Sequence, residues 1–324
     1  MTAPGWLGGD RRALLRRLRP ERAGGPIRPV PKTGPLPVSP AQQRLWFLDQ
    51  LAPGTGLYNV PGGLWLRGPL DVEALRRAFR AVVGRHEVLG SAFRPDEAGR
   101  LVSVPAGLAA AVTVTEVPGG RAEALRIAEG LAVEPLDIVV GPVLRAALLR
   151  CGPQEHLLVL VIHHIVADGW ALGVILQDLA TAYTDPDGLP ELDIQYADYA
   201  AWQRDRLASG TAERQLAYWR GRLAGARASR LPTDRPWPRR PTYAGATLTR
   251  RMAPQVMAGL RSWAGRHRAT PFMAATALYA SALSRWSGQT DLTLGTLPPA
   301  GTGWRPPLGR LLREHAAHPP RPLR

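Results

Sequence analysis

The stretch VLVIHHIVADGWALGVILQDL, residues 159–179, places two adjacent histidines between an apolar run and an Asp-Gly pair. The apolar run begins as HLLVLVI at residues 156–162, and such a short, continuous, branched run is typical of a strand buried on both faces. The residues that follow carry apolar side chains at helical spacing over 170–183: Leu172, Leu176, Leu179 and Tyr183. The stretch therefore predicts a strand, a tight loop and a helix, with the histidines and Asp168 at the joint.

Helical and strand patterns continue on both sides of this stretch. Asp71 comes directly before an apolar run of helical spacing and is a candidate N-cap. The periodicity predicts further helices at residues 41–51, 71–89, 196–225, 254–268 and 270–288, and further strands at residues 246–252 and 291–296. This mixture indicates an α/β protein with the layers of an α+β sandwich.

The chain has 324 residues, enough for one large domain or two of ordinary size. Its formal charge of +15 raises the question of nucleic-acid binding, because clustered basic side chains neutralise phosphates. Nearly all of this positive charge is arginine scattered along helical faces, and Lys32 is the only lysine. Since no recognition motif accompanies the charge, we expect a solvated basic surface and no nucleic-acid partner.

The single cysteine, Cys151, excludes an internal disulfide and a paired-cysteine metal site, and it fits a reducing compartment. The first residues lack the apolar run of a signal peptide, and no stretch reaches the ~20 apolar residues that span a bilayer. We therefore expect a soluble, cytoplasmic protein without a membrane partner.

The residues at the joint suggest acyl transfer. Side chains alternate in direction along a strand, so one of His163 and His164 is expected to face an interior channel and the other the scaffold. Asp168 suits an acceptor that caps backbone amides or pairs with a cation. Gly169 lets a bound group approach the helix N-terminus, where positive partial charge stabilises an oxyanion. A neutral imidazole takes a proton from an attacking amine or orients it.

Other chemistries fit these residues less well. Adjacent histidines are awkward ligands for one ion, and no third ligand follows at a recognised spacing, which disfavours a metal site. No serine stands in a GxSxG elbow and no Walker-type phosphate loop is present, which disfavours nucleophilic hydrolysis and phosphate binding. A purely structural histidine pair beside a helix cap stays open on this stretch alone.

Four motifs, in order, resemble those of the condensation domains of nonribosomal peptide synthetases. HHIVADG at residues 163–169 matches the HHxxxDG motif of that family. SPAQQRLWFLDQL at 39–51 is similar to its first motif, RHEVLGSAF at 85–93 to its second, and YADYAAWQ at 196–203 to its fourth. The resemblance covers residues 36–296 and is far more specific than any one motif.

The resemblance implies two lobes, each similar to chloramphenicol acetyltransferase, with the active site in a tunnel between them. It also implies that donor and acceptor carrier proteins present thioesters on phosphopantetheine arms, so that the domain binds no cofactor of its own. Adenylation domains are then its neighbours in secondary metabolite biosynthesis. The acceptor's aminoacyl amine attacks the upstream acyl thioester, which forms an amide and lengthens the peptide by one residue.

Carried over by position, the resemblance assigns the catalytic role to His164, which positions or deprotonates the amine. His163 and Asp168 become structural supports, and Gly169 lines the tunnel near the thioester carbonyl. The DGW sequence resembles domains that join an L-configured donor to an L acceptor, and the two histidines disfavour heterocyclisation. An epimerisation-type relative stays open.

The motifs divide the chain into four predicted segments: a leader helix at 10–19 and a Pro/Gly-rich linker within 1–35, an N-terminal condensation lobe at 36–205, a partial C-terminal lobe at 206–296, and a Pro/Arg-rich, disordered tail at 297–324. The family's fifth motif does not follow, so we expect a truncated second lobe. We interpret the altered composition of the tail as a shifted reading frame. The arginine of the fifth motif, the expected partner of Asp168, is then missing too.

Two functional hypotheses follow from these predictions. The first is an amide-bond-forming acyltransferase that acts on carrier-bound substrates. The second is an inactive remnant that at most binds a carrier protein.

Overall fold

The structure, a computed structural model, describes residues 26–295 apart from residues 108, 227–230, 237, 240–242, 244 and 247. The predicted leader helix at 10–19 and the predicted tail at 297–324 lie outside the described residues. The described chain forms two compact units, which divide between Arg214 and Gln215. The lobe boundary predicted between residues 205 and 206 stays a prediction.

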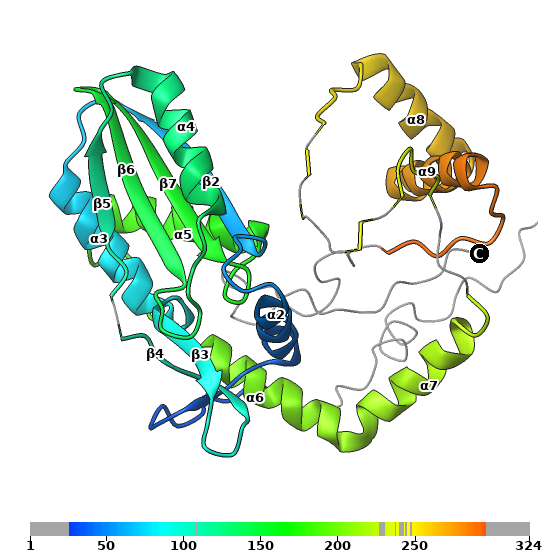
Figure 1. The fold of residues 1–324 in the computed structure, drawn as a ribbon, viewed down its shortest axis with the longest axis horizontal. Coiled ribbons are helices and arrows are strands. Elements are labelled where there is room, and N and C mark those ends of the chain that lie inside the picture. Colours follow the sequence, from blue (N-terminus) through cyan, green and yellow to red (C-terminus); the bar gives the residue numbers. More distant parts are fainter. Residues whose placement is uncertain are drawn as a thin grey trace, which may run out of the picture. The chain divides into compact units, whose positions relative to one another are not determined.

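The first unit is built on a four-stranded sheet with the strand order β2-β7-β6-β5 (Figure 1). Its strands are β2 (Asn59–Arg67), β5 (Val112–Glu116), β6 (Leu144–Gly152) and β7 (Glu155–His163). β7 runs antiparallel to both neighbours, whereas β5 runs parallel to β6. The long register between β2 and β7 ends with Asn59 opposite His163, so β2 braces the end of the strand that carries the histidines.

A second, smaller sheet has the order β1-β4-β3 and consists of β1 (Leu36–Pro37), β3 (Ser91–Pro95) and β4 (Leu101–Pro105). The helices of this unit are α2 (Pro40–Leu51), α3 (Val72–Arg85), η1 (Glu87–Gly90), α4 (Gly120–Val133), α5 (Gly169–Thr184) and α6 (Tyr196–Arg206). They confirm the helices predicted at 41–51, 71–89 and 170–183, and Asp71 is the N-cap of α3 as predicted. The combination of helices and sheets confirms the predicted α/β class.

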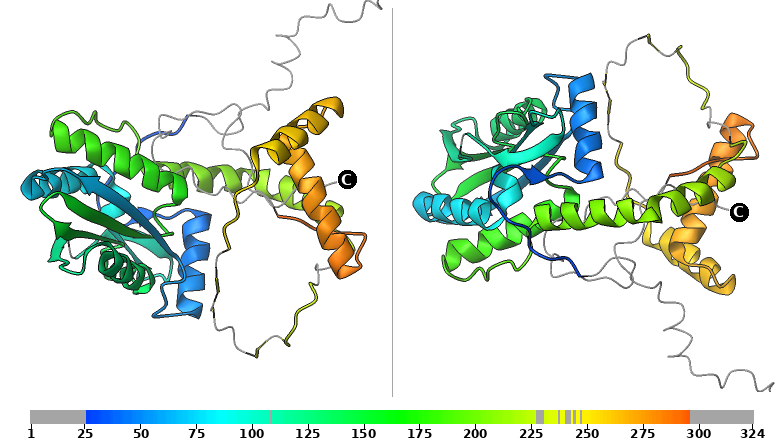
Figure 2. Two further views of the ribbon diagram at one scale, coloured as in Figure 1. Left: turned by 90° about the horizontal axis from the view of Figure 1, so that it is seen from above. Right: turned by 90° about the horizontal axis from the view of Figure 1, so that it is seen from below.

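Helices cover both faces of the four-stranded sheet (Figure 2). α3 and α5 pack on one face, and α4 packs on the other. The residues of β7 alternate between the two cores: Leu158, Leu160 and Ile162 belong to the core with α3 and α5, and Leu157, Val159 and Val161 belong to the core with α4. The prediction of a strand buried on both faces is therefore confirmed.

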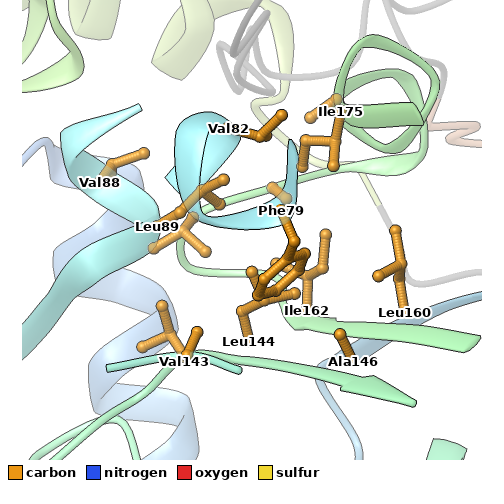
Figure 3. Close-up of a cluster of buried hydrophobic side chains, with 14 of the residues drawn as sticks. Phe79, Val82, Val88, Leu89, Val143, Leu144, Ala146, Leu160, Ile162 and Ile175 are labelled. Carbon is orange, nitrogen blue, oxygen red and sulfur yellow. The ribbon is translucent and has the colours of Figure 1, made fainter. Parts of the chain in front are cut away.

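The larger core lies between α3, α5 and the sheet (Figure 3). Phe79 of α3 lies beside Leu144 and Ile162 of two neighbouring strands, and Ile175 belongs to the same core from α5. Full burial of one such side chain contributes roughly 1.5–3 kcal/mol. Because α5 is held over β7 in this way, the loop between them is fixed at both of its ends.

The second unit contains most of α7 (Ala212–Arg222) together with α8 (Pro254–Arg266) and α9 (Pro271–Ser287), and α8 packs on α9. These last two helices confirm the predictions at 254–268 and 270–288. The helical region predicted at 196–225 is confirmed by α6 and α7, which a π-helical turn, η2 (Leu207–Thr211), separates. Gly210 in this turn has φ +81°, a left-handed value that glycine adopts without strain.

The strands predicted at 246–252 and 291–296 are wrong over their described residues, which form neither strand nor helix. A strand satisfies its backbone N–H and C=O groups by pairing with a neighbour. The described residues of the second unit contain no strand that could pair with either segment. The side-chain pattern thus indicated a local preference for a strand. These residues contain no second strand with which it could pair.

A buried ionic cluster ties the end of α3 to α5. Asp178 of α5 is 1% exposed, and its Oδ2 lies 2.9 Å from Nε2 of His86 and 3.3 Å from Nε of Arg85. Burial lowers the pKa of His86, so the neutral imidazole donates its Nε2–H to the carboxylate. The guanidinium of Arg85 is also buried, and Asp178 neutralises its charge.

We predict that Asp178→Ala destabilises the first unit by about 3–5 kcal/mol, because it leaves the buried Arg85 charge without its counter-ion. Asp193→Ala, at an exposed aspartate, is the matched control and is expected to change stability by less than about 0.5 kcal/mol. Urea unfolding of both variants followed by circular dichroism measures the difference. Equal midpoints for the two variants would contradict the role of this cluster.

Candidate functional site

The candidate site lies where β7 ends and α5 begins. β7 ends at His163, α5 begins at Gly169, and residues 164–168 join them. His163 is 3% exposed, whereas His164 is half-buried, so the two rings have different surroundings, as the alternation along a strand predicts. The structure places all four predicted site residues, His163, His164, Asp168 and Gly169, on this one joint.

Hydrogen bonding fixes the tautomer of His163. Its Nδ1 accepts a hydrogen bond from the Ile165 N–H (3.1 Å), so the proton of the neutral ring is on Nε2. Nε2 lies 3.6 Å from Oδ1 of Asp49 in α2, and burial raises the pKa of that carboxyl. Burial of the His163 ring, and then the charge of His164, lowers the pKa of His163 to about 4. His163 is therefore neutral at pH 7.

His164 has the opposite tautomer. Its Nδ1 lies 2.7 Å from the carbonyl oxygen of Ala167, and because a carbonyl oxygen only accepts, Nδ1 carries the ring proton. The lone pair of the neutral ring is then on Nε2. The backbone N–H of His164 donates to the carbonyl oxygen of Tyr58 (2.7 Å), which fixes the main chain at the same residue. The loop thus fixes the orientation of the His164 ring through Nδ1.

Asp168 caps α5, as the sequence predicts. Its Oδ1 accepts a hydrogen bond from the Ala171 N–H (2.8 Å), which satisfies one of the N–H groups left open at a helix start. Among the residues that the structure describes, Asp168 has no ion pair. The expectation that its arginine partner from a fifth motif is missing stays a prediction.

Gly169 is the first residue of α5 and is exposed. A Cβ added to it would meet no atom within 4 Å, so packing does not require glycine at this position. The space beside Gly169 is open to a bound group, and the helix N-terminus places positive partial charge there. The indole of Trp170, which follows, is 62% exposed.

Sequence reasoning missed two side chains of α2 that contact residues 163–168, which we call the histidine loop. Gln42 donates from Nε2 to the carbonyl oxygen of Ile165 (3.2 Å), and Asp49 lies beside Nε2 of His163. One signal could have found them. Gln42, Leu45, Trp46 and Asp49 follow the spacing of a single helix face, so two polar residues occupy positions where that face is otherwise apolar.

The arrangement brings together an imidazole whose Nδ1 is bound to a backbone carbonyl, an open space beside Gly169 and the N-terminus of a helix. Such a set can accept a proton from a nucleophile and stabilise negative charge on an oxygen. Over the part of the chain that the structure describes, no three His, Cys, Asp or Glu side chains gather as a metal site requires. Within the same part, no helix has the length and apolar character needed to cross a membrane.

Curated relatives of this chain are peptide synthetases. The chain is 41% identical over 287 residues to a linear gramicidin synthase from Brevibacillus parabrevis, a match that covers 85% of this chain and 4% of the relative. It is 40% identical over 322 residues to phosphinothricin tripeptide synthetase PhsC of Streptomyces viridochromogenes, which covers 94% of this chain and 30% of the relative. The chain thus spans less than a third of the length of either relative.

Solved structures with the same fold include the X-domain from teicoplanin biosynthesis, with a TM-score of 0.80 and 26% identity over 89% of this chain and 65% of that one. The complex of that X-domain with OxyB gives a TM-score of 0.73 and 30% identity over 83% of this chain and 61% of that one. The first condensation domain of the CDA synthetase gives 0.64 and 25% identity over 81% and 64% of the two chains. The fold is that of condensation domains.

The sequence model of the family described as "Condensation domain" matches residues 32–298, which is most of the chain. The match contains the histidine loop, α2 and α6, the segments that carry the motifs found in the sequence. Together with the similarity to two peptide synthetases and to solved condensation domains, it confirms the resemblance seen in the sequence. The chain belongs to the condensation-domain family of nonribosomal peptide synthetases.

Proposed function

We propose that this domain forms a peptide bond between two carrier-bound substrates in nonribosomal peptide biosynthesis. The observation that carries the proposal is the contact of Nδ1 of His164 with the Ala167 carbonyl oxygen, which assigns the ring proton to Nδ1 and leaves the basic lone pair on Nε2. An amine that becomes bonded to a carbonyl carbon must lose a proton, and a neutral imidazole is suited to accept it near pH 7. The site supplies such a base beside an open space at a helix start.

His163 is unsuited to the role of base. Its lone pair on Nδ1 already accepts the Ile165 N–H, and its pKa of about 4 makes the ring a weak acceptor of protons. Protonation of Nδ1 would break the bond to Ile165. We therefore assign His163 a supporting role and His164 the catalytic one.

In the proposed reaction, the amine nitrogen of the acceptor attacks the carbonyl carbon of the donor thioester. The carbonyl oxygen gains negative charge, which the N-terminus of α5 beside Gly169 stabilises. Nε2 of His164 takes the proton of the attacking amine. The intermediate then expels the donor thiolate, which takes the proton back from Nε2 of His164 and leaves as a thiol, and the acyl group ends on the acceptor as an amide.

Carrier proteins are the proposed partners on both the donor and the acceptor side, and each presents its substrate on a phosphopantetheine arm. In this proposal the domain holds no cofactor of its own and works beside adenylation domains in the cytoplasm. The similarity to two multi-domain synthetases supports these partners, since the chain matches a small part of each.

A binding module without chemistry is the second candidate function. The solved complex of the teicoplanin X-domain with OxyB favours it, because that domain has the same fold and binds a partner protein. In this alternative the histidine loop is a structural joint and carriers bind without reaction.

We predict that His164→Ala lowers the single-turnover rate of peptide formation by about 10²–10⁴-fold, because it removes the general base. His164→Gln keeps a donor for the Ala167 carbonyl but has no basic nitrogen, so we expect it to be as slow. The measurement uses aminoacyl-loaded carriers on both sides and analyses the product by mass and configuration, which separates condensation from epimerisation. Product from both variants at the parental rate would exclude His164 as the base, whereas carrier binding without product from the parent would favour the binding module.

We predict that His163 makes the protein less stable in acid. Its folded pKa of about 4 lies below the ordinary value of about 6.5, so the unfolded chain binds a proton more readily over that interval. Stability should fall as pH drops from about 6.5 to about 4, by on the order of 3 kcal/mol from this residue.

His163→Asn tests this acid dependence, because asparagine can still accept the Ile165 N–H but does not titrate. Chemical unfolding at several pH values should show a smaller loss of stability between pH 6.5 and pH 4 in the variant. Some loss will remain, since burial also lowers the pKa of His86 and His156. Parallel curves for parent and variant would contradict the lowered pKa of His163.

A further inference from the structure

Gln42 connects α2 to the histidine loop through its buried side-chain amide. It is 2% exposed, and its Oε1 accepts a hydrogen bond from the Ser39 N–H (3.0 Å). Its Nε2 donates to the carbonyl oxygen of Ile165 (3.2 Å), which is 123 residues away along the chain. Its backbone N–H donates to Oγ of Ser39 (3.1 Å), which completes the capping box of α2. One amide thus joins the start of a helix to the loop.

The first turn of α2, which carries Gln42, is itself anchored. Oγ of Ser39 lies 2.8 Å from the hydroxyl oxygen of Tyr196, a buried residue at the start of α6. The first turn of α2 is therefore fixed against α6 as well as by its own cap. Because this turn is fixed, the Gln42 side chain can set the position of the Ile165 carbonyl.

Three of the hydrogen bonds that hold the main chain around His164 come from different parts of the fold. The His164 N–H donates to Tyr58, the Ile165 N–H donates to His163, and the Ile165 carbonyl accepts from Gln42. The first two partners lie on or beside the paired strands β2 and β7, and the third lies on α2. Of these three bonds, the one from Gln42 is the one that a helix outside the sheet supplies.

We propose that Gln42 is a positioning residue for His164, which it orients through the Ile165 carbonyl. The inference rests on the proposed function, in which Nε2 of His164 must face the attacking amine. Displacing a catalytic group by about 1 Å costs on the order of 10²-fold in rate. A side chain that fixes the peptide next to His164 therefore controls the rate without touching a substrate.

Gln42→Glu separates this role from the helix cap. Glutamate at this position serves the capping box as well as glutamine does, so α2 still begins at the same residue. The substitution, however, replaces the donor that faces the Ile165 carbonyl by an acceptor. We expect the single-turnover rate at pH 7.5 to fall about 10- to 100-fold. Gln43→Glu adds the same charge at the exposed neighbouring position and should leave the rate unchanged.

Acid should partly restore Gln42→Glu, which a merely structural role would not produce. The introduced carboxyl, once protonated, donates its O–H to the Ile165 carbonyl, so the rate relative to the parent should rise as the pH falls. The charged and titratable groups around this side chain are Glu87, Lys32 and Tyr196 near the small cavity that Gln42 lines, and His163 and Asp49 near the loop. They are common to parent and variant, and the ratio of the two rates removes their effect.

Gln42→Met is the second variant, in case the introduced carboxylate prevents folding. Methionine has a similar length but offers neither the donor nor the acceptor, so the rate should fall about 10-fold and should not recover in acid. A recovery of Gln42→Met in acid would overturn the proposal, and so would parental rates in both Gln42 variants.

A measurement that needs no activity distinguishes failure of this inference from failure of the proposed function. Nitrogen-15 spectra of the histidine rings report which nitrogen carries the proton. The parent should show His164 protonated on Nδ1, and Gln42→Glu should shift its ring signals while Gln43→Glu leaves them in place. Unchanged His164 signals in Gln42→Glu would overturn the positioning role even if the parent makes no peptide. Shifted signals with an inactive parent would support the positioning role and reject the proposed reaction.

Discussion

The hydrogen bond from the Ile165 N–H to Nδ1 of His163 is the contact on which the geometry of the site depends. A strand buried on both faces cannot simply end, because its last backbone groups lie where water does not reach them. At the end of β7, the side chain of its last residue, His163, accepts the N–H of Ile165, two residues further along the chain. The chain then turns, and the neighbouring histidine is left with its ring partly accessible.

Other polar groups in the loop at residues 164–168 also satisfy the fold and shape the site. Asp168 uses its carboxylate on the first turn of α5, and the Ala167 carbonyl uses its lone pair on the His164 ring. The buried charge of Asp178 then fixes α5 to the end of α3, where it meets both Arg85 and His86. Leaving any of these groups unpaired in the interior would cost free energy. The contacts that satisfy them therefore also fix the geometry of the site.

The segment around the histidines and several helices of the first unit could be predicted from local pattern, whereas strands β1 to β6 and helix α4 were not predicted. The strand at 156–162, the helix from 170 and the caps at Asp71 and Asp168 follow from burial on two faces, helical spacing and short polar side chains, all of which are read over a few residues. The strands expected in the second unit failed, since a strand depends on a partner that local pattern does not reveal. Gln42 and Asp49 were missed for a related reason, because their partners lie more than a hundred residues away.

The opposite tautomers of the two histidines have a consequence for the path of a proton. A relay between adjacent rings needs a lone pair on the receiving ring, but the one on His163 is bound to Ile165. A proton gained at Nε2 of His164 is therefore not passed on to the ring of His163. In the proposed reaction the departing thiolate takes this proton, so recovery of the base is linked to departure of the thiol.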